Sequence, residues 1–154
     1  MTTHSVLHAT FTLERTYPVT PARVFAAWAE PAAKARWFAG PDAGHELDFR
    51  VGGREKVHRD GRNGDPALTF ESVYQDIVSG ERIVYTSTLS ADNRLATVSL
   101  TTVQFRAAGN GTQLVLTEQG TFLDGQEQPG WREKGTGTWL DALATEFKTA
   151  ATPR

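Results

Sequence analysis

The order of motifs between residues 15 and 54 constrains the fold more than any other feature of the chain. The segment reads as a strand, two short helices that each begin at a proline, and a second strand that leads into two glycines. Thr20 stands before Pro21, and a threonine cap followed by proline at the first helical position marks a helix start. Pro31 opens the second helix, which we expect to run through Phe38. This order predicts a sheet with two small helices inserted after its first strand.

Alternation of apolar and polar side chains predicts the strands of this sheet, because neighbouring residues of a strand point to opposite faces. Residues 10–17 alternate in this way and are rich in threonine and aromatic residues. We expect further strands over residues 45–51, 54–59, 67–75, 81–89, 96–106 and 112–119. Short turns join most of these segments, so consecutive strands are expected to pair antiparallel.

Two local irregularities are expected within the sheet. In a regular strand Val98 and Leu100 would point to the opposite face from Val103, although all three are apolar. A β-bulge near residues 101–102 would place all three side chains on the same face. Gly52 and Gly53 are expected to supply the positive φ angles of a tight turn between two strands.

The C-terminal part of the chain predicts a long helix. Its apolar residues recur at the i, i+3, i+4, i+7 spacing of one helix face, and they are Leu140, Leu143, Ala144 and Phe147. The helix can begin as early as Trp131. An amphipathic helix that follows a sheet buries its apolar stripe across one face of that sheet. We therefore expect an α+β fold in which a curved antiparallel sheet of about six or seven strands wraps around a long C-terminal helix.

Length and charge limit the domain organisation and the partners. A chain of 154 residues is long enough for one domain and short for two, so we expect a flexible N-terminus over residues 1–9, a single domain over residues 10–148 and a C-terminal tail over residues 149–154. The net charge of −2 gives no broad attraction to nucleic acid. No segment approaches the ~20 apolar residues of a membrane helix, and the N-terminus lacks the pattern of a secretory signal. We expect a cytoplasmic protein without nucleic-acid or membrane partners.

No motif of a known catalytic or cofactor site is present. The sequence lacks HExxH, P-loop, GxSxG and dinucleotide-binding patterns. The absence of cysteine excludes disulfides, thiol catalysis and thiolate metal sites. We therefore predict no catalytic residue, no metal site and no cofactor.

A set of motifs in a characteristic order resembles one protein family. The matching residues are Arg15, Pro21, Val24-Phe25, Trp28, Pro31, Arg36-Trp37-Phe38, Asp48, Arg50 and Gly52-Gly53. The chain resembles the family named for homology to the activator of heat-shock protein 90 ATPase, within the START-like (SRPBCC), birch-pollen-allergen-like superfamily, over about residues 10–148. The resemblance implies the helix-grip fold of that superfamily. It also implies a role in the stress response, with a heat-shock chaperone as a partner.

In a helix-grip fold the space between the sheet and the C-terminal helix is often an apolar cavity, which suits a small hydrophobic ligand. The aromatic residues of this chain either fill the core or line such a cavity. The predicted ligand-binding residues are Trp37, His45, Phe49, Tyr85, Glu118, Phe122, Trp131 and Trp139. Trp37, Phe122 and Trp131 lie near the ends of expected elements, where the mouth of a cavity would be.

Two of these residues are polar but have the parity of the apolar face. His45 shares a face with Leu47, and Glu118 shares a face with Leu116. One interpretation is that both lie at strand ends and reach water. The other is that both lie at the rim of a cavity, where they orient a ligand or act as a base. Arg15 also has inward parity, and it either pairs with Glu118 or extends outward to water.

Three functions therefore stand as hypotheses. The first is binding of a small hydrophobic ligand, or an accessory role linked to a chaperone. The second is a cyclase-like or hydrolase-like enzyme with His45 or Glu118 as general base. The third is direct stimulation of the ATPase of a heat-shock chaperone. The oligomeric state, monomer or homodimer, is left open.

Overall fold

The computed structural model describes residues 4–148. The elements follow in the order β1 (Val6–Tyr17), α1 (Pro21–Ala29), α2 (Pro31–Lys34), η1 (Ala35–Ala39), β2 (Gly44–Leu47), β3 (Arg54–Arg59), β4 (Leu68–Val78), β5 (Arg82–Ala91), β6 (Arg94–Ala108), β7 (Gly111–Leu123), α3 (Pro129–Leu143) and η2 (Ala144–Phe147). The turn η1 is π-helical and the turn η2 is 3-10 helical.

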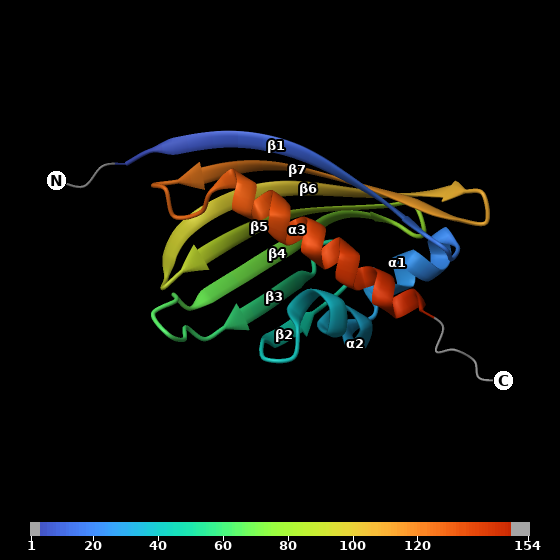
Figure 1. The fold of residues 1–154 in the computed structure, drawn as a ribbon, viewed down its shortest axis with the longest axis horizontal. Helices are drawn as coiled ribbons and strands as arrows, with labels where there is room; N and C mark the ends of the chain where they lie inside the picture. Colours follow the sequence, from blue (N-terminus) through green and yellow to red (C-terminus); the bar gives the residue numbers. More distant parts are fainter. Residues whose placement is uncertain (1–3, 149–154) are drawn as a thin grey trace.

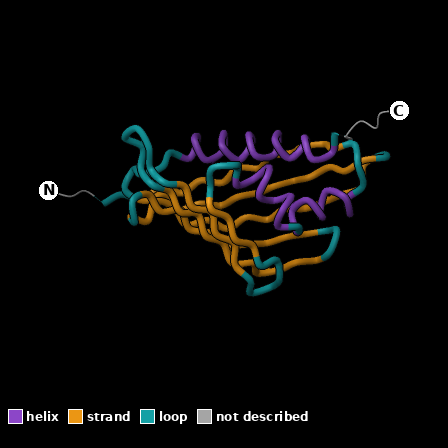
Figure 2. The backbone as a smooth tube through the Cα atoms, turned by 90° about the horizontal axis from the view of Figure 1, so that it is seen from below, coloured by secondary structure: helices purple, strands orange, loops and turns teal. Residues whose placement is uncertain are grey.

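The strands form one antiparallel sheet in the order β1-β7-β6-β5-β4-β3-β2 (Figure 1). The sheet is curved, and all of the helices lie on one side of it (Figure 2). The long helix α3 runs diagonally across this face, with α1 and α2 near its C-terminal end (Figure 1). The expected α+β helix-grip fold is confirmed. None of the described helices is long and apolar enough to cross a membrane.

The two helices after β1 begin where the sequence predicts. The Thr20 side chain accepts a hydrogen bond from the Arg23 backbone N–H at 3.3 Å, and Pro21 occupies the first turn of α1. From Pro31 the chain forms one α-helical turn and continues as η1. Gly40 then ends the helix with a φ of +85°, a conformation that favours glycine.

The helix α3 is fastened to the first strand by its apolar stripe. Leu140, Leu143 and Phe147 are buried. The Tyr17 hydroxyl donates a hydrogen bond to the Leu140 carbonyl at 2.7 Å, and the Tyr17 ring meets the Phe147 ring edge-on at 5.4 Å. Arg15 does not pair with Glu118. Its Nε atom instead lies 2.8 Å from Oδ1 of Asp141, so β1 and α3 are also joined by an ion pair near the surface.

The prediction of a β-bulge near residues 101–102 of β6 is wrong, because the irregularity lies elsewhere in the strand. The pairing of β6 with β7 is continuous through residues 101–102, whereas the register with β5 shifts opposite Leu89 and Ser90, near residue 96. Val98 and Leu100 therefore lie on the outer face of the sheet and are partly exposed. The prediction assumed that every apolar side chain of the strand points toward the core. It failed because the outer face of β6 also carries apolar residues.

Two expected boundaries also change. The strand β1 begins at Val6, inside the segment that the sequence analysis assigned to the N-terminus. Residues 1–3 and the expected tail 149–154 lie outside the described residues. The strand β2 ends at Leu47 rather than at residue 51, because residues 48–53 turn back toward β3.

The two glycines of this turn have different roles. Gly52 has a φ of +83°, as expected. Gly53 does not adopt positive φ, and it is needed because a Cβ atom there would lie 2.1 Å from the Asp48 carbonyl oxygen. The backbone therefore passes too closely at Gly53 for any side chain.

Gly53→Ala is expected to lower the free energy of unfolding by about 2 kcal/mol or more, since the backbone of the turn must move to accept a methyl group. Gly44→Ala is the matched control, because Gly44 also lacks a positive φ and a Cβ atom there would lie 3.9 Å from the His58 carbonyl oxygen, an ordinary contact. Its cost should stay within about 0.5 kcal/mol. Chemical denaturation of both variants measures the difference, and equal costs would contradict the close approach at Gly53.

Candidate functional site

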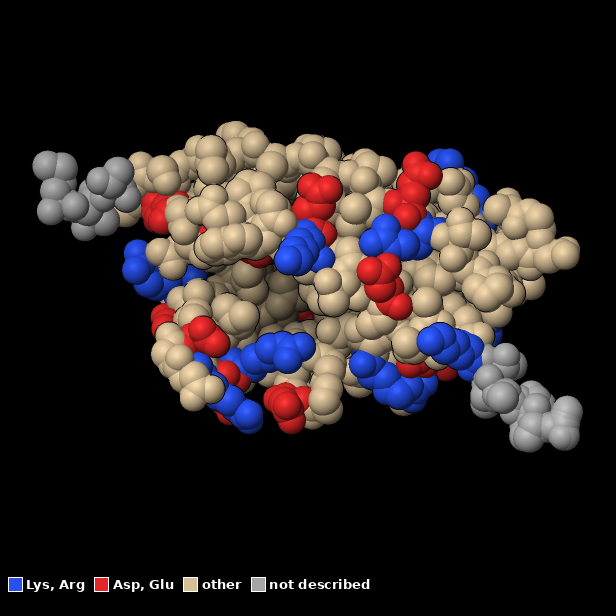
Figure 3. All heavy atoms as spheres, in the orientation of Figure 1, with Lys and Arg blue, Asp and Glu red and all other residues tan. Residues whose placement is uncertain are grey.

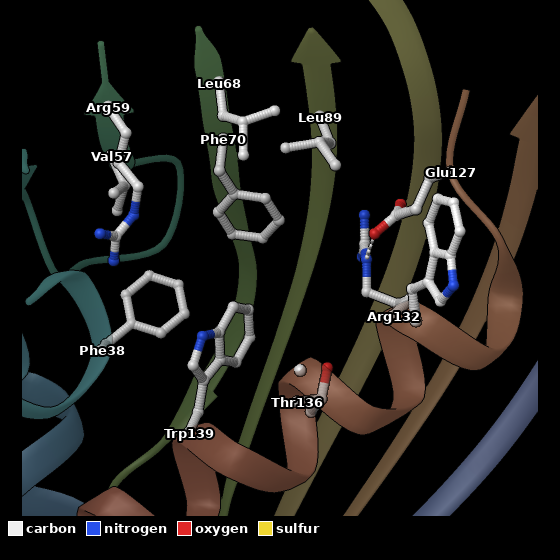
Figure 4. A pocket seen from close by; sticks show the side chains of 12 residues that line it. Phe38, Val57, Arg59, Leu68, Phe70, Leu89, Glu127, Arg132, Thr136 and Trp139 are labelled. Atoms are coloured by element: carbon white, nitrogen blue, oxygen red, sulfur yellow. Dashed lines mark hydrogen bonds and ion pairs between the residues drawn. The ribbon is translucent and has the colours of Figure 1, made fainter. Parts of the chain in front are cut away.

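A pocket of about 220 Å³ opens between α3 and the strands β3, β4 and β5. In the space-filling view the surface is hollowed beside α3, between the helix and the strands (Figure 3). The lining residues are Phe38, Val57, Arg59, Leu68, Phe70, Leu89, Glu127, Trp131, Arg132, Gly135, Thr136 and Trp139, and Figure 4 shows them from close by. The pocket thus lies between the sheet and the C-terminal helix, where the sequence analysis places a cavity.

The floor of the pocket is a row of apolar side chains that crosses three strands. Val57 of β3 pairs with Phe70 of β4, and Phe70 pairs with Leu89 of β5. Directly paired residues of antiparallel strands point to the same face of the sheet. The register of these strands therefore places all three side chains beneath α3.

One wall of the pocket is aromatic. Phe38 of η1 and Trp139 of α3 meet edge-on, with ring centroids 4.4 Å apart. Phe70 lies 5.8 Å from Phe38 and 6.0 Å from Trp139. Aromatic pairs in this geometry contribute about 0.5–1.5 kcal/mol beyond their buried area. The wall is therefore held in place by contacts between its own rings.

The mouth of the pocket lies along one side of α3. Trp131 is 65% exposed there, and Trp139 lies two turns further along the helix. Gly135 sits between them, and a Cβ atom added to it would meet no atom within 4 Å. The small residue leaves the gap between the two tryptophans open.

The other wall contains a buried ionic group centred on Arg132. Its Nη1 donates to Glu118 at 2.6 Å and its Nε donates to Glu127 at 3.1 Å. Thr101 donates to the free oxygen of Glu118 at 3.2 Å, and Thr97 donates to that of Glu127 at 2.6 Å. We call these residues the Arg132 cluster. Figure 4 shows Arg132 rising from α3 to meet Glu127 beside the pocket.

Burial and pairing oppose each other in the Arg132 cluster. Burial raises the pKa of Glu118 above its usual range, although the charge and hydrogen bond of Arg132 act against this effect. Burial alone would lower the pKa of Arg132, but the nearby charges of Glu118 and Glu127 raise it. The guanidinium therefore stays charged and is held between two carboxyl groups.

A second buried ionic group lies behind the aromatic wall. The Lys34 ammonium donates to Glu55 at 2.8 Å, and the Tyr74 hydroxyl donates to the same Glu55 oxygen at 2.7 Å. His45 Nε2 lies 2.8 Å from the other Glu55 oxygen. The Lys34 ammonium also stands 4.4 Å from the ring centroid of Phe38. We call Lys34, His45, Glu55 and Tyr74 the Lys34 cluster.

Aromatic rings and hydrogen bonds together stabilise the charges of the Lys34 cluster. The rings of Trp28 and Trp37 face the Lys34 ammonium at 5.1 Å and 5.6 Å, within the range of cation–π attraction. Burial would raise the pKa of Glu55, but the charge of Lys34 and the hydrogen bonds from His45, Lys34 and Tyr74 hold it at about 2. Glu55 is therefore ionised at neutral pH despite its burial.

The predicted ligand-binding residues divide into two groups in the structure. Trp131 and Trp139 line the pocket, and Glu118 supports it through Arg132. The others lie in the hydrophobic core or the Lys34 cluster, away from the pocket lining, and they are Trp37, His45, Phe49, Tyr85 and Phe122. Trp37, for example, donates its indole N–H to the Ala27 carbonyl at 2.9 Å.

The interpretation that His45 and Glu118 reach water is wrong. The side chain of His45 is 7% exposed and that of Glu118 is 4% exposed. Both point inward, as their parity indicates, and both are bound to charged partners that sequence analysis did not identify. These partners, Glu55 and Arg132, supply the compensation that buried polar groups need.

Signals for some of the missed residues are present in the sequence. Arg132 and Thr136 continue the stripe of Leu140 toward the N-terminus at intervals of four residues. Lys34 has the i, i+4 spacing to Phe38 that places both on one helix face. A charged residue on an apolar stripe is a sign of a buried pair, but it does not say which residue is the partner.

Comparison with known proteins defines the family. The family described as "Activator of Hsp90 ATPase homolog 1-like protein" matches residues 18–148. The chain belongs to this family. The Hsp90-activator-homologue resemblance seen in the sequence is thereby confirmed over most of the chain. No protein of curated function matches the chain.

Three solved structures are similar to this chain and share its fold. The Mll3558 protein from Rhizobium loti is 44% identical, with 92% of this chain and 99% of that chain covered and a TM-score of 0.86. An uncharacterized protein from Rhizobium leguminosarum is 39% identical, with 94% and 97% covered and a TM-score of 0.89. Protein CV1439 from Chromobacterium violaceum is 27% identical, with 89% and 95% covered and a TM-score of 0.73. These names state no ligand or activity.

Proposed function

We propose that the protein binds a small, largely apolar ligand in the pocket between the sheet and α3. The observation that carries this proposal is an opening of about 220 Å³ with aliphatic and aromatic walls from both layers of the fold. Typical pockets for drug-sized ligands have ~300–1,000 Å³. The ligand, or its buried portion, is therefore about as large as a fused pair of rings or a short acyl chain.

The two residues considered as general bases favour binding over catalysis. Glu118 is held by Arg132 and His45 is held by Glu55, and neither residue lines the pocket. A general base must come within hydrogen-bond reach of its substrate. A base function for either residue would require a rearrangement of the cluster that contains it.

Chaperone stimulation rests on the family name rather than on a site in this structure. Members of a fold family can differ in function, so membership alone does not identify a partner. A pull-down against the chaperone of the host, with ATPase rates measured in parallel, tests this role. Binding with a change in rate would establish it beside ligand binding.

N-phenyl-1-naphthylamine, an uncharged dye that fluoresces in apolar surroundings, is expected to bind with micromolar affinity. Gly135→Phe should weaken this binding by tenfold or more, because the new ring closes the gap between Trp131 and Trp139. The same substitution should not lower the free energy of unfolding, since glycine is a poor helix former and the site has space. Dye titration and chemical denaturation of the variant measure the two effects.

Gly130→Phe is the matched control, because Gly130 also lies in α3 with open space around its Cβ position but does not line the pocket. Its dye affinity should equal that of the unmodified protein. Equal affinity in the Gly135→Phe variant would show that the dye binds elsewhere. Absence of dye binding to the unmodified protein would remove the proposed function.

A further inference from the structure

Two polar groups of the pocket lining have no hydrogen-bond partner among the described residues. They are Nη2 of Arg132 and the hydroxyl of Thr136. Arg132 is 5% exposed and Thr136 is 1% exposed, so neither group can be satisfied by bulk water. Trp28 Nε1 shares this condition but belongs to the core, outside the pocket lining.

These two groups lie on one face of α3. Arg132 and Thr136 are four residues apart, a spacing that brings side chains of a helix next to each other. Figure 4 shows both side chains rising from α3 toward the strands that form the floor. The two unpartnered groups therefore belong to neighbouring side chains on the side of α3 that lines the pocket.

The two groups require an acceptor. Nη2 of a guanidinium carries only donors, and a hydroxyl can donate as well as accept. Buried groups of this kind are normally bonded, because an unmade hydrogen bond is unfavourable away from water. An oxygen atom that enters the pocket with a ligand would remove this penalty, whereas a pure hydrocarbon would leave it in place.

The charged groups around Arg132 favour an uncharged acceptor on the ligand over a charged one. Arg132 already binds two carboxyl groups, Glu118 at 2.6 Å and Glu127 at 3.1 Å. One positive charge therefore stands between two acidic groups. A ligand carboxylate beside Arg132 would add a third acidic group in a buried space, where repulsion between like charges is strong.

We propose that the ligand carries an uncharged carbonyl oxygen, as in a ketone, ester or amide, which accepts hydrogen bonds from Nη2 of Arg132 and from the hydroxyl of Thr136. This inference rests on the proposed function and narrows its ligand class. The apolar part of the ligand lies over Phe70 and Leu89. The carbonyl lies against α3.

Three naphthalenes of nearly equal size test the proposal by displacement of N-phenyl-1-naphthylamine. They are 2-acetylnaphthalene with a carbonyl, 2-ethylnaphthalene with no acceptor, and 2-naphthoate with a carboxylate. We expect 2-acetylnaphthalene to bind about 5-fold more tightly than either of the others, since one or two hydrogen bonds contribute a ~2–10-fold gain each. Equal affinity for 2-ethylnaphthalene would overturn the proposal.

Tightest binding of 2-naphthoate would also overturn it, and would point to an anion that pairs with a guanidinium. Arg59 at the other side of the pocket is the candidate for that pairing, because its guanidinium donates a hydrogen bond to the Ala39 carbonyl but pairs with no carboxylate among residues 4–148. Failure of the dye to bind would instead remove the proposed function itself, so the two failures are distinguishable.

Thr136→Val separates the acceptor site from general pocket shape. The substitution keeps the volume of the side chain and removes the hydroxyl, so the preference for 2-acetylnaphthalene over 2-ethylnaphthalene should fall from about 5-fold to about 2-fold. Thr138→Val is the matched control, since Thr138 is exposed on the same helix and bonds to the Lys134 carbonyl. An unchanged preference in Thr136→Val would exclude Thr136 as a donor.

Arg132→Lys provides a second variant if the threonine variant is poorly folded. A lysine keeps the positive charge near Glu118 and Glu127 but has no group equivalent to Nη2. The preference for the carbonyl compound should fall in this variant as well. Retention of the full preference would exclude Nη2 as a donor.

Discussion

Replacement of Lys34 by methionine is expected to lower the free energy of unfolding by about 3–5 kcal/mol, the largest effect of any single substitution considered for this protein. The variant leaves Glu55 buried without its cation, although the hydrogen bonds from His45 and Tyr74 remain. It also removes the charge that faces the ring of Phe38. Urea denaturation at pH 7 measures the loss.

A double variant and a surface control separate pairing from packing. Lys34→Met combined with Glu55→Gln removes both charges and should recover at least half of the lost stability, because no unpaired charge remains buried. Lys56→Met breaks the exposed pair with Glu71, whose charged atoms lie 3.8 Å apart. Exposed pairs contribute about 0–1 kcal/mol. A loss at Lys34 no larger than the loss at Lys56 would contradict the structural role of the Lys34 cluster.

Acid is expected to destabilise the protein through Glu55. Its pKa is about 2 in the folded protein, compared with an ordinary value of 4.5. A carboxyl group whose pKa is lowered by folding contributes its full stabilisation above the unfolded pKa. That contribution is lost as the pH falls from about 4.5 to about 2. Linkage between protonation and folding gives a total of about 3 kcal/mol for a shift of this size.

The double variant without charges at residues 34 and 55 isolates this contribution. Unfolding free energies at pH 7, 4 and 3 should fall less steeply in the double variant than in the unmodified protein. Other carboxyl groups titrate in both proteins, so only the difference between the two slopes reports on Glu55. Identical slopes would mean that Glu55 is not held ionised by folding.

The period of apolar residues was sufficient to predict the architecture. Alternation over residues 10–17 and the stripe of Leu140 gave a sheet and a helix that must bury each other's apolar faces. The same rule failed in β6, where Val98 and Leu100 are apolar but lie on the outer face. The spacing of apolar residues shows which residues share a face of a strand or helix, but it does not show which face is buried.

The pocket was predicted only in part. Trp131 and Trp139 line it, whereas Phe38 and Phe70 were not selected among the aromatic residues of the chain. The distinction depends on register, since Phe70 lies beneath α3 only because it pairs with Val57 and Leu89. Register and the packing angle of a helix are properties of the assembled sheet, and a local sequence pattern does not contain them.

The position of Phe38 has a consequence for how this pocket can diversify among relatives. The Phe38 ring meets the Lys34 ammonium and also meets Trp139 in the pocket wall, so a substitution at Phe38 would disturb a buried charge as well as the pocket wall. Leu68 and Leu89 line the pocket but stand outside the main core cluster. We therefore expect family members to vary more at these two leucines than at Phe38, where an aromatic ring should be kept.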